Sequence, residues 1–260
     1  MIPNKENYFS KEIDMEYMSV SQFKLFNECE AKALATINGL ESAVHKEAFI
    51  EGSLFEALVS GDKQLFMAQH PELISSRGAT AGQIKSNYAK VISAAEKFNS
   101  QDFFVNIVEK CEKQVVLTAE FCDVKVKCAI DLFDKMTNSI YDIKCMKDFK
   151  EQWSKEEKAY QPWYYVYDYV LQLAVYREIV KQNFGTEPSE VGLIAATKED
   201  APDIQALKFS NELLDLEFSH FIDKIKRYDL IKKGFVEPIQ CGCCDYCKSI
   251  KNIREFEVIK

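Results

Sequence analysis

The chain has 260 residues, of which 47% are hydrophobic and 28% are charged, and its formal net charge at pH 7 is −8. This composition is ordinary for a globular protein with a sizeable core. We find no apolar run near the roughly 20 residues that cross a bilayer, and no basic region followed by an apolar stretch that would mark a secretory signal. We therefore expect a cytoplasmic protein without a membrane partner. The acidic balance argues against a protein that coats nucleic acid through its overall charge, but it is compatible with a local basic channel.

In chain order, the patterns predict helices, then a small sheet, then helices again. Residues 1–17 show no pattern and are interpreted as an arm. Ser21 is the predicted N-cap of a first helix that carries Cys29 and ends near Gly39. The further elements are helices at about 46–60, 62–72 and 80–111, strands at 113–121, 123–133 and 139–146, a helix at 162–181, strands at 191–197 and 204–209, and a helix at 210–233. This order predicts a single α/β (α+β) domain over residues 1–260, with an N-terminal helical part at about 18–111.

The two strands around residues 124–146 carry acids and a lysine on one predicted face. If their hairpin folds evenly about Met136 and Thr137, Asp131 lies across from Asp142, with side chains about 5 Å apart. Two carboxylates this close repel each other unless one is protonated or a cation lies between them. Lys144 points to the same face, and two acids with a lysine are the components of a divalent-metal hydrolysis site. An ordinary solvent-facing hairpin is the alternative.

Other polar residues could complete such a site. The 162–181 helix is apolar nearly all round, yet Asp168, Gln172 and Tyr176 form one polar stripe on it. Buried polar groups need partners. Internal hydrogen bonds are the preferred explanation for Asp168, whereas for Gln172 and Tyr176 a charged site is an equal alternative. Glu56 lies one turn after Gly52 in an otherwise apolar helix and could point into a contact, although an acid on such a helix is usually solvated.

Four cysteines fall within residues 241–247. Cys241, Cys244 and Cys247 give two successive C-x-x-C steps, a spacing typical of metal or cluster ligands. A tetrahedral site needs a fourth sulfur. The adjacent Cys243 is a poor geometric candidate, and Cys29 fits if the two ends of the chain meet. Free thiols remain the alternative.

Together these segments resemble the PD-(D/E)XK nuclease superfamily, specifically its RecB-like and phage-type exonuclease (exonuclease VIII-like) branch. The resemblance runs from about Met18 to Lys248 and implies a restriction-endonuclease-like core with a small mixed sheet flanked by helices. The matching motifs are Ser19-Val-Ser21-Gln-Phe…Cys29-Glu, Gly52-Ser-Leu-Phe-Glu56, Asp131 with Asp142-Ile-Lys144, and Gln172-Leu-Ala-Val-Tyr176. Glu56 stands where many RecB-like members have His, and Asp142 replaces the commoner Glu.

The resemblance implies a metal-dependent deoxyribonuclease, an exonuclease acting on double-stranded DNA ends in phage or mobile-element recombination or repair, together with a recombination partner protein. Mg²⁺ or Mn²⁺ would be bound by Glu56, Asp131, Asp142 and the carbonyl group of Ile143. Lys144 would orient or deprotonate the attacking water, Gln172 would position Lys144 or the phosphate, and Tyr176 would support Gln172. The candidate phosphate contacts are Ser21, Lys147, Lys150, Lys155 and Lys158, and a solvated face is an equal alternative for the lysines.

The same resemblance implies a [4Fe–4S] cluster on Cys29, Cys241, Cys244 and Cys247, although the tight spacing of the last three differs from the usual one and Zn²⁺ is the alternative. Two other classes of function remain open. One is a non-catalytic DNA-binding or scaffold protein on the same fold. The other is a metal-cluster protein in which the carboxylates have no role.

Overall fold

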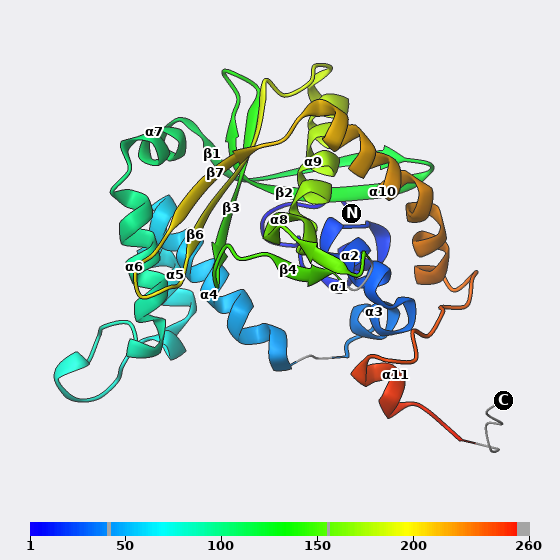
Figure 1. The fold of residues 1–260 in the computed structure, drawn as a ribbon, viewed down its shortest axis with the longest axis horizontal. Helices are drawn as coiled ribbons and strands as arrows, with labels where there is room; N and C mark the ends of the chain where they lie inside the picture. Colours follow the sequence, from blue (N-terminus) through cyan, green and yellow to red (C-terminus); the bar gives the residue numbers. More distant parts are fainter. Residues whose placement is uncertain (41–42, 155–156, 254–260) are drawn as a thin grey trace. The chain divides into compact units, whose positions relative to one another are not determined.

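A five-stranded mixed sheet in the order β1-β2-β3-β6-β7 lies at the centre of the fold (Figure 1). Strands β3 and β6 pair in parallel, whereas the pairs β2–β3 and β6–β7 are antiparallel. The strands are β1 (Glu112–Phe121), β2 (Val124–Asp134), β3 (Ser139–Met146), β6 (Glu190–Thr197) and β7 (Ile204–Lys208). The predicted fold class, a small mixed sheet flanked by helices, is confirmed.

The structure is a computed structural model that describes residues 1–40, 43–154 and 157–253, and for residues 43–46 it describes the backbone only. Two compact units are present. The first consists of Met1–Glu41, Thr118–Lys127 and Ser219–Lys260, and the second consists of Ser42–Leu117 and Cys128–Phe218. The single domain expected from the sequence stays a prediction, and each unit is described by itself below.

The register of β2 against β3 decides where the acidic side chains lie. Leu132 pairs with Tyr141, and towards the turn Phe133 pairs with Ile140 and Asp134 pairs with Ser139. Asp131 and Asp142 are therefore the next opposing positions, as an even hairpin predicts. Because successive strand residues point to opposite faces of a sheet, the two aspartates share one face and Leu132 lies on the other.

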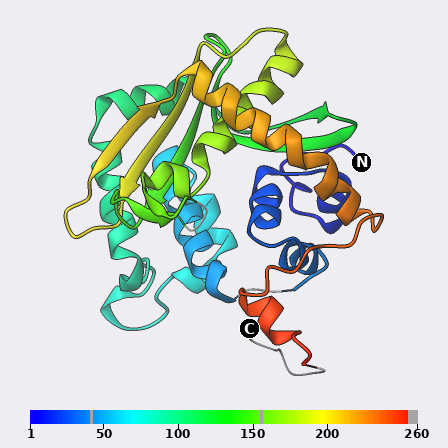
Figure 2. The same ribbon diagram turned by 45° about the vertical axis from the view of Figure 1, so that its right-hand side comes forward.

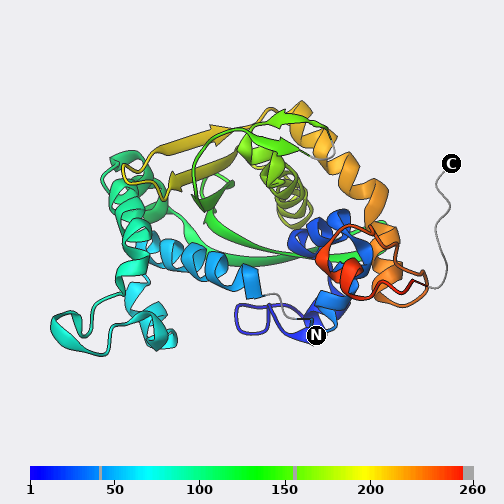
Figure 3. The ribbon, with the colours of Figure 1, turned by 60° about the horizontal axis from the view of Figure 1, so that its bottom comes forward.

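Helices cover both faces of this part of the sheet in the second unit. Ile143 of β3 and Ile194 of β6 belong to a core that also includes buried residues of three helices: α4 (Ala43–Ser60), α6 (Ala89–Asn99) and α7 (Asp102–Lys110). Helices α4 and α6 lie side by side in Figures 1 and 2. The opposite face receives α9 (Tyr169–Phe184) (Figure 3). The Gln172 side chain of this helix donates a hydrogen bond to Asp142 of β3.

The prediction of a single helix at 162–181 is wrong, because this segment forms two helices. Helix α8 (Trp163–Val166) ends before α9 begins at Tyr169. Between them Asp168 adopts a left-handed backbone with φ +52°, a conformation that aspartate tolerates better than most residues. Asp168 is consequently the N-cap residue of α9 instead of the first member of a continuous polar stripe.

The remaining elements of the second unit include a two-stranded ribbon that the sequence did not predict. Strands β4 (Gln152–Ser154) and β5 (Ala159–Gln161) form it within the lysine-rich stretch after β3. The unit also contains α5 (Lys63–Gln69), the short 3-10 turns η1 (Pro71–Leu73), η2 (Gly78–Thr80) and η3 (Ser86–Tyr88), and the start of α10 (Asn211–Lys232). Across the described ranges, we find no helix that is both long enough and apolar enough to span a membrane.

The first unit contains both ends of the chain. Its helices are α1 (Lys11–Glu16), α2 (Val20–Glu28), α3 (Glu30–Ile37), the second half of α10, and α11 (Asp245–Ser249). Aromatic side chains join α2 to α10, with Phe26 stacked on Tyr228 at 5.0 Å between ring centroids.

Three sequence predictions for the first unit are corrected. The presumed arm contains α1. The N-cap of α2 is Ser19, whose hydroxyl accepts a hydrogen bond from the Gln22 amide, and not Ser21. The first helix does not continue to Gly39, because Cys29 has an extended backbone and separates α2 from α3.

Candidate active site and candidate metal centre

Asp131, Asp142 and Lys144 meet on one face of the sheet, as the register requires. The Lys144 Nζ lies 2.6 Å from Asp142 Oδ2 and 3.9 Å from Asp131 Oδ2. Asp131 is held by the backbone, since its Oδ2 accepts a hydrogen bond of 2.9 Å from the Ile143 amide. Lys144 also donates to the Ile143 carbonyl oxygen at 3.3 Å. The hairpin alone thus assembles two acids, one cation and one carbonyl oxygen.

Two helices and the neighbouring strand bring further side chains to this group. The Gln172 amide on α9 donates a 2.6 Å hydrogen bond to Asp142 Oδ1. On β1, the Gln114 amide donates to Asp131 Oδ1 at 3.2 Å and to Glu56 Oε1 of α4. We call Glu56, Asp131, Asp142 and Lys144 the carboxylate cluster.

Burial makes the negative charges of this cluster costly. Desolvation raises the pKa of Asp131 well above its ordinary value, and the nearby Asp142 raises it further. Desolvation also raises the pKa of Glu56, against the hydrogen bond from Gln114. Burial opposes the charge on Lys144, but Asp142 and Asp131 together outweigh it and raise the pKa of the ammonium. The cluster therefore has more acidic groups than its one lysine compensates.

The donor chemistry of the cluster suits a divalent cation. Carboxylate and carbonyl oxygens are the ligands that Mg²⁺ and Mn²⁺ prefer. Asp142 Oδ2 is buried, and among the described residues no donor makes a well-aligned hydrogen bond to it, although the Lys144 Nζ is close. Glu56, Asp131, Asp142 and the Ile143 carbonyl are therefore the candidate ligands for such an ion.

Two residues near the cluster were missed by the sequence analysis. Gln114 lies in a strand whose pattern gave no reason to single it out, and its positive φ of +52° has no sequence marker such as glycine. Tyr169 begins α9, and the Lys144 Nζ lies 5.3 Å from the centroid of its ring. Burial raises the pKa of Tyr169 to about 12. Tyr176 is buried one helical turn beyond Gln172, and its supporting role stays a prediction.

The predicted phosphate contacts stay predictions as well. Ser21 in the first unit and Lys147, Lys150 and Lys158 in the second unit are exposed. Lys155 lies outside the described residues.

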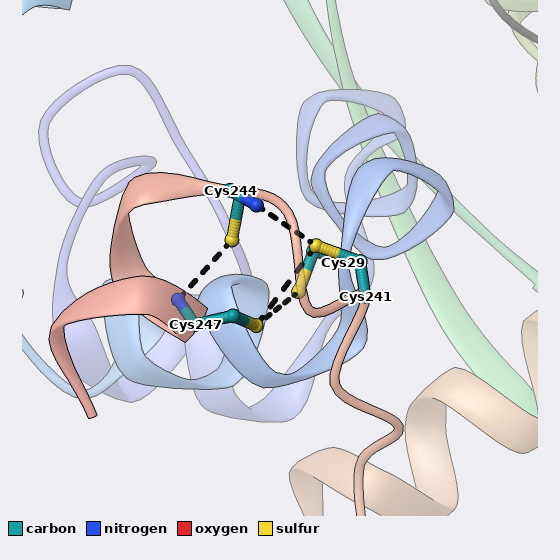
Figure 4. Close-up of side chains that lie close together, drawn as sticks. All are labelled: Cys29, Cys241, Cys244 and Cys247. Carbon is teal, nitrogen blue, oxygen red and sulfur yellow. Dashed lines mark hydrogen bonds between the residues drawn. The ribbon is translucent and has the colours of Figure 1, made fainter. Parts of the chain in front are cut away.

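The second group of candidate ligands is in the first unit, where Cys29, Cys241, Cys244 and Cys247 converge (Figure 4). All four Sγ atoms lie within 4.8 Å of one another. The Cys29 and Cys247 sulfurs, which are 218 positions apart in the sequence, are separated by 3.5 Å. We call these four residues the cysteine cluster. The structure thus brings Cys29 to the three C-terminal cysteines, as the sequence predicted.

Comparison with known proteins agrees with this geometry. A family model described as "PDDEXK-like domain of unknown function (DUF3799)" matches residues 19–250. The chain belongs to this PDDEXK-like family. The match includes every residue of both clusters, and it confirms the superfamily that the sequence motifs resemble.

A crystal structure from Eubacterium rectale, provisionally described as an exonuclease, is similar to this PDDEXK-like chain over nearly its whole length. The sequences are 27% identical, the TM-score is 0.87, and the alignment covers 99% of this chain and 97% of the other. A second solved structure, of SSO0001, has 13% identity and a TM-score of 0.33 over 76% of this chain and 84% of its own, which is too low to carry an argument. No curated protein matches the chain.

These comparisons support a nuclease, which is a hydrolase with a nucleic acid substrate. PDDEXK nucleases typically use divalent metals, and the cysteine cluster offers a set of ligands for another metal.

Proposed function

We propose that this PDDEXK-like domain is a Mg²⁺- or Mn²⁺-dependent deoxyribonuclease that degrades linear DNA from its ends. The observation that carries the proposal is the convergence of Glu56, Asp131 and Asp142 on Lys144, with Gln172 bonded to Asp142. The exonuclease description of the Eubacterium rectale protein supports the same assignment.

Glu56, Asp131, Asp142 and the Ile143 carbonyl would hold the metal. Bound there, the ion would lower the pKa of a water molecule and offset the charge that develops on the phosphate.

Lys144 is proposed to stabilise charge instead of removing a proton. Its carboxylate neighbours raise the pKa of the ammonium, so the amine is protonated at neutral pH and is a donor. The Asp142 and Ile143 oxygens hold the Nζ in place, where it can orient a water molecule and stabilise a phosphorane oxygen without rearrangement. Of the two roles that the sequence leaves open for Lys144, orientation is therefore the one that we propose.

Gln172 is proposed to fix the Asp142 carboxylate through its 2.6 Å hydrogen bond. Tyr176 is proposed to support Gln172 on the buried side of α9. Ser21, Lys147 and Lys150 are proposed as phosphate contacts. The family resemblance extends the proposal to double-stranded ends in phage or mobile-element recombination, with a recombination partner protein, in the cytoplasm.

The test compares the wild type with Asp142→Asn on end-labelled linear duplex DNA, on closed circular DNA and on RNA, with Mg²⁺, with Mn²⁺ and with EDTA. We expect metal-dependent shortening of linear DNA from its ends by the wild type and none by the variant. Cleavage of closed circular DNA would show that the enzyme is an endonuclease and not an exonuclease. Faster cleavage of RNA than of DNA would show that RNA is the preferred substrate. DNA binding without cleavage under any metal condition would overturn the proposal in favour of a non-catalytic scaffold.

A further inference from the structure

We propose that the cysteine cluster binds one tetrahedrally coordinated, thiolate-preferring ion, with zinc as the expected occupant, instead of the [4Fe–4S] cluster that the family resemblance implies. This site is separate from the carboxylate cluster, and the proposal does not rest on the nuclease assignment.

The sulfur separations carry the inference. A zinc–thiolate bond is about 2.3 Å long, so the sulfurs at the corners of a tetrahedron around one ion are about 3.8 Å apart. Here Cys29 Sγ is 3.5 Å and Cys241 Sγ is 3.9 Å from Cys247 Sγ, and no pair among the four exceeds 4.8 Å. In a [4Fe–4S] cluster each thiolate binds a different iron atom, so the four sulfurs must stand much farther apart. The observed set is the size of a single-ion site.

The backbone around the cluster is arranged as a support for thiolate ligands. The Cys244 amide donates to Cys241 Sγ at 3.3 Å, and the Cys247 amide donates to Cys244 Sγ at 3.4 Å. Gly242, with φ +72°, permits the tight turn between the first two ligands. Hydrogen bonds of this kind orient metal ligands and stabilise their charge.

Separate hydrogen bonds hold the segment that precedes Cys241 next to the start of α3, beside Cys29. The Ile239 amide donates to Glu30 Oε2 at 2.7 Å, and the same carboxylate accepts two hydrogen bonds from Arg227, of 2.7 and 2.8 Å. The Ala31 amide donates to the Ile239 carbonyl oxygen at 3.3 Å. The residues on either side of the ligands are thus held before any ion binds.

The experiment is metal analysis of the full chain, purified without oxygen from cells supplied with both iron and zinc. We expect about one zinc per chain, no labile sulfide and no broad absorption near 400 nm. After exchange into Co²⁺, we expect the intense visible bands of a tetrahedral tetrathiolate site. Cys29→Ser should lose the ion or shift the cobalt bands.

Cys243→Ser is the matched control, because Cys243 lies in the same segment with its Sγ 3.7 Å from Cys241 Sγ but is not one of the four converging ligands. Its metal content and cobalt bands should equal those of the wild type. Several irons with labile sulfide per chain would overturn the proposal. So would a reduced, folded protein that takes up neither zinc nor cobalt, or loss of the ion in Cys243→Ser.

The structure also assigns a positioning role to Gln114 in the carboxylate cluster, an inference that rests on the proposed function. One amide group donates to carboxylates from two different elements, Glu56 of α4 and Asp131 of β2. We propose that this bridge holds the two acids together as a preformed pair of metal ligands.

The backbone conformation at Gln114 independently supports a functional role for this side chain. Its φ of +52° is in the left-handed region, which residues with side chains rarely adopt and which is uncommon within a strand. Such conformations persist where the surroundings enforce them, and they cluster at functional sites. Removal of the amide should let the two like-charged carboxylates separate in the metal-free protein.

The test is Mn²⁺ binding to the free protein, followed by electron paramagnetic resonance without DNA, together with the metal dependence of cleavage. In Gln114→Met, which keeps the length but has no donor, we expect Mn²⁺ affinity to fall about tenfold. Cleavage at saturating metal should largely recover, whereas a folding defect would lower it at every metal concentration. Gln114→Gly should show the same loss of affinity with an unchanged or higher melting temperature, because glycine removes the backbone strain.

Gln205→Met is the matched control, since the Gln205 side chain accepts a 3.2 Å hydrogen bond from the Trp163 indole, a partner outside the carboxylate cluster. Its Mn²⁺ affinity should not change. Wild-type affinity in Gln114→Met would overturn the positioning role while leaving the nuclease intact. Failure of the wild type to bind Mn²⁺ and to cleave DNA would overturn both.

Discussion

The two clusters of candidate ligands differ in where their ligands come from and in which groups support them. In the carboxylate cluster the candidate ligands come from three elements, α4, β2 and β3, and the neutral side-chain amides of Gln114 and Gln172 donate hydrogen bonds to their carboxylates. In the cysteine cluster three of the four ligands come from seven consecutive residues, and backbone amides support the sulfurs. The first arrangement gathers hard oxygen atoms from a helix and two paired strands, and the second gathers soft sulfur atoms mainly from one short segment of chain.

With the functions proposed above, this difference assigns catalysis to the carboxylate cluster and stability to the cysteine cluster. Excess buried negative charge destabilises the metal-free protein but prepares a site for a reactive ion, which is a trade-off expected of active sites. A tetrathiolate site leaves no open position for substrate, so its ion would contribute to folding alone. Substitutions at each cluster can therefore test the two roles separately.

Loss of the Lys144 ammonium should have the largest effect on activity. Lys144→Met should lower the rate of DNA cleavage on the order of 10³-fold, because the cluster loses its only cationic donor. The check is the initial rate of linear DNA degradation at saturating Mg²⁺. Equal rates in the variant and the wild type would show that the carboxylates act without the lysine.

Cys29→Ser should lower the stability of the folded protein. We expect the free energy of unfolding to fall by several kcal/mol and the chain to lose its thiolate-bound ion, since metal binding at such sites is coupled to folding. Denaturant melts and metal analysis measure both quantities. Cys122→Ser is the control, because Cys122 is exposed and does not belong to the cluster. If Cys29→Ser abolished Mn²⁺ binding at the carboxylate cluster in protein that remains folded, the two sites would not be independent.

Asp131→Asn should stabilise the metal-free protein by about 1–2 kcal/mol at pH 8, because it removes a carboxylate whose charge is disfavoured by burial. The contribution of Asp131 to stability is fully present below its unfolded pKa of about 3.9 and is lost as pH rises through the raised folded pKa. The difference between variant and wild type should therefore vanish near pH 3 and grow as the pH rises. Chemical unfolding in EDTA across this range provides the test, and a difference that shrinks with rising pH would contradict the assigned shift.

The smallest effect is expected for the exposed lysines after β3. Replacement of Lys147 and Lys150 by alanine should weaken DNA binding modestly and reduce the slope of log affinity against log salt by about 0.9 for each lysine that contacts a phosphate. Binding is measured with EDTA to prevent cleavage. Lys63→Ala removes a charge from α5 and should leave the slope unchanged. Equal slopes in all variants would remove these lysines from the interface.

The sequence predicted those parts of the site that depend on strand periodicity and chain order. Period-two alternation fixes which side chains share a face, and an even turn fixes that Asp131 opposes Asp142. Gln172 was found because it is a polar residue on a mostly apolar helix, where burial demands a partner. Glu56 was selected by its position after Gly52 and by the resemblance of that segment to a family motif, since an acid on such a helix is usually solvated. Cys29 was found because three clustered thiols lack a fourth ligand.

Two features that the sequence could not predict result from a left-handed backbone conformation at residues other than glycine. Asp168 breaks the 162–181 helix, and Gln114 is turned toward the acids, each with φ +52°. Neither position carries a glycine or proline, so tertiary packing, and not local preference, sets these conformations. A similar limit applies to Lys127, a charged residue of β2 that is buried, with its Nζ 2.6 Å from Asp14 Oδ1.

The composition of the first unit bears on how the protein is made. Every segment of the second unit has been synthesised once residue 218 leaves the ribosome, whereas the cysteine cluster needs Cys247. Domains generally fold as units during synthesis. We therefore expect the second unit of the nascent chain to fold first, with Cys29 remaining an unligated thiol until Cys247 has been synthesised.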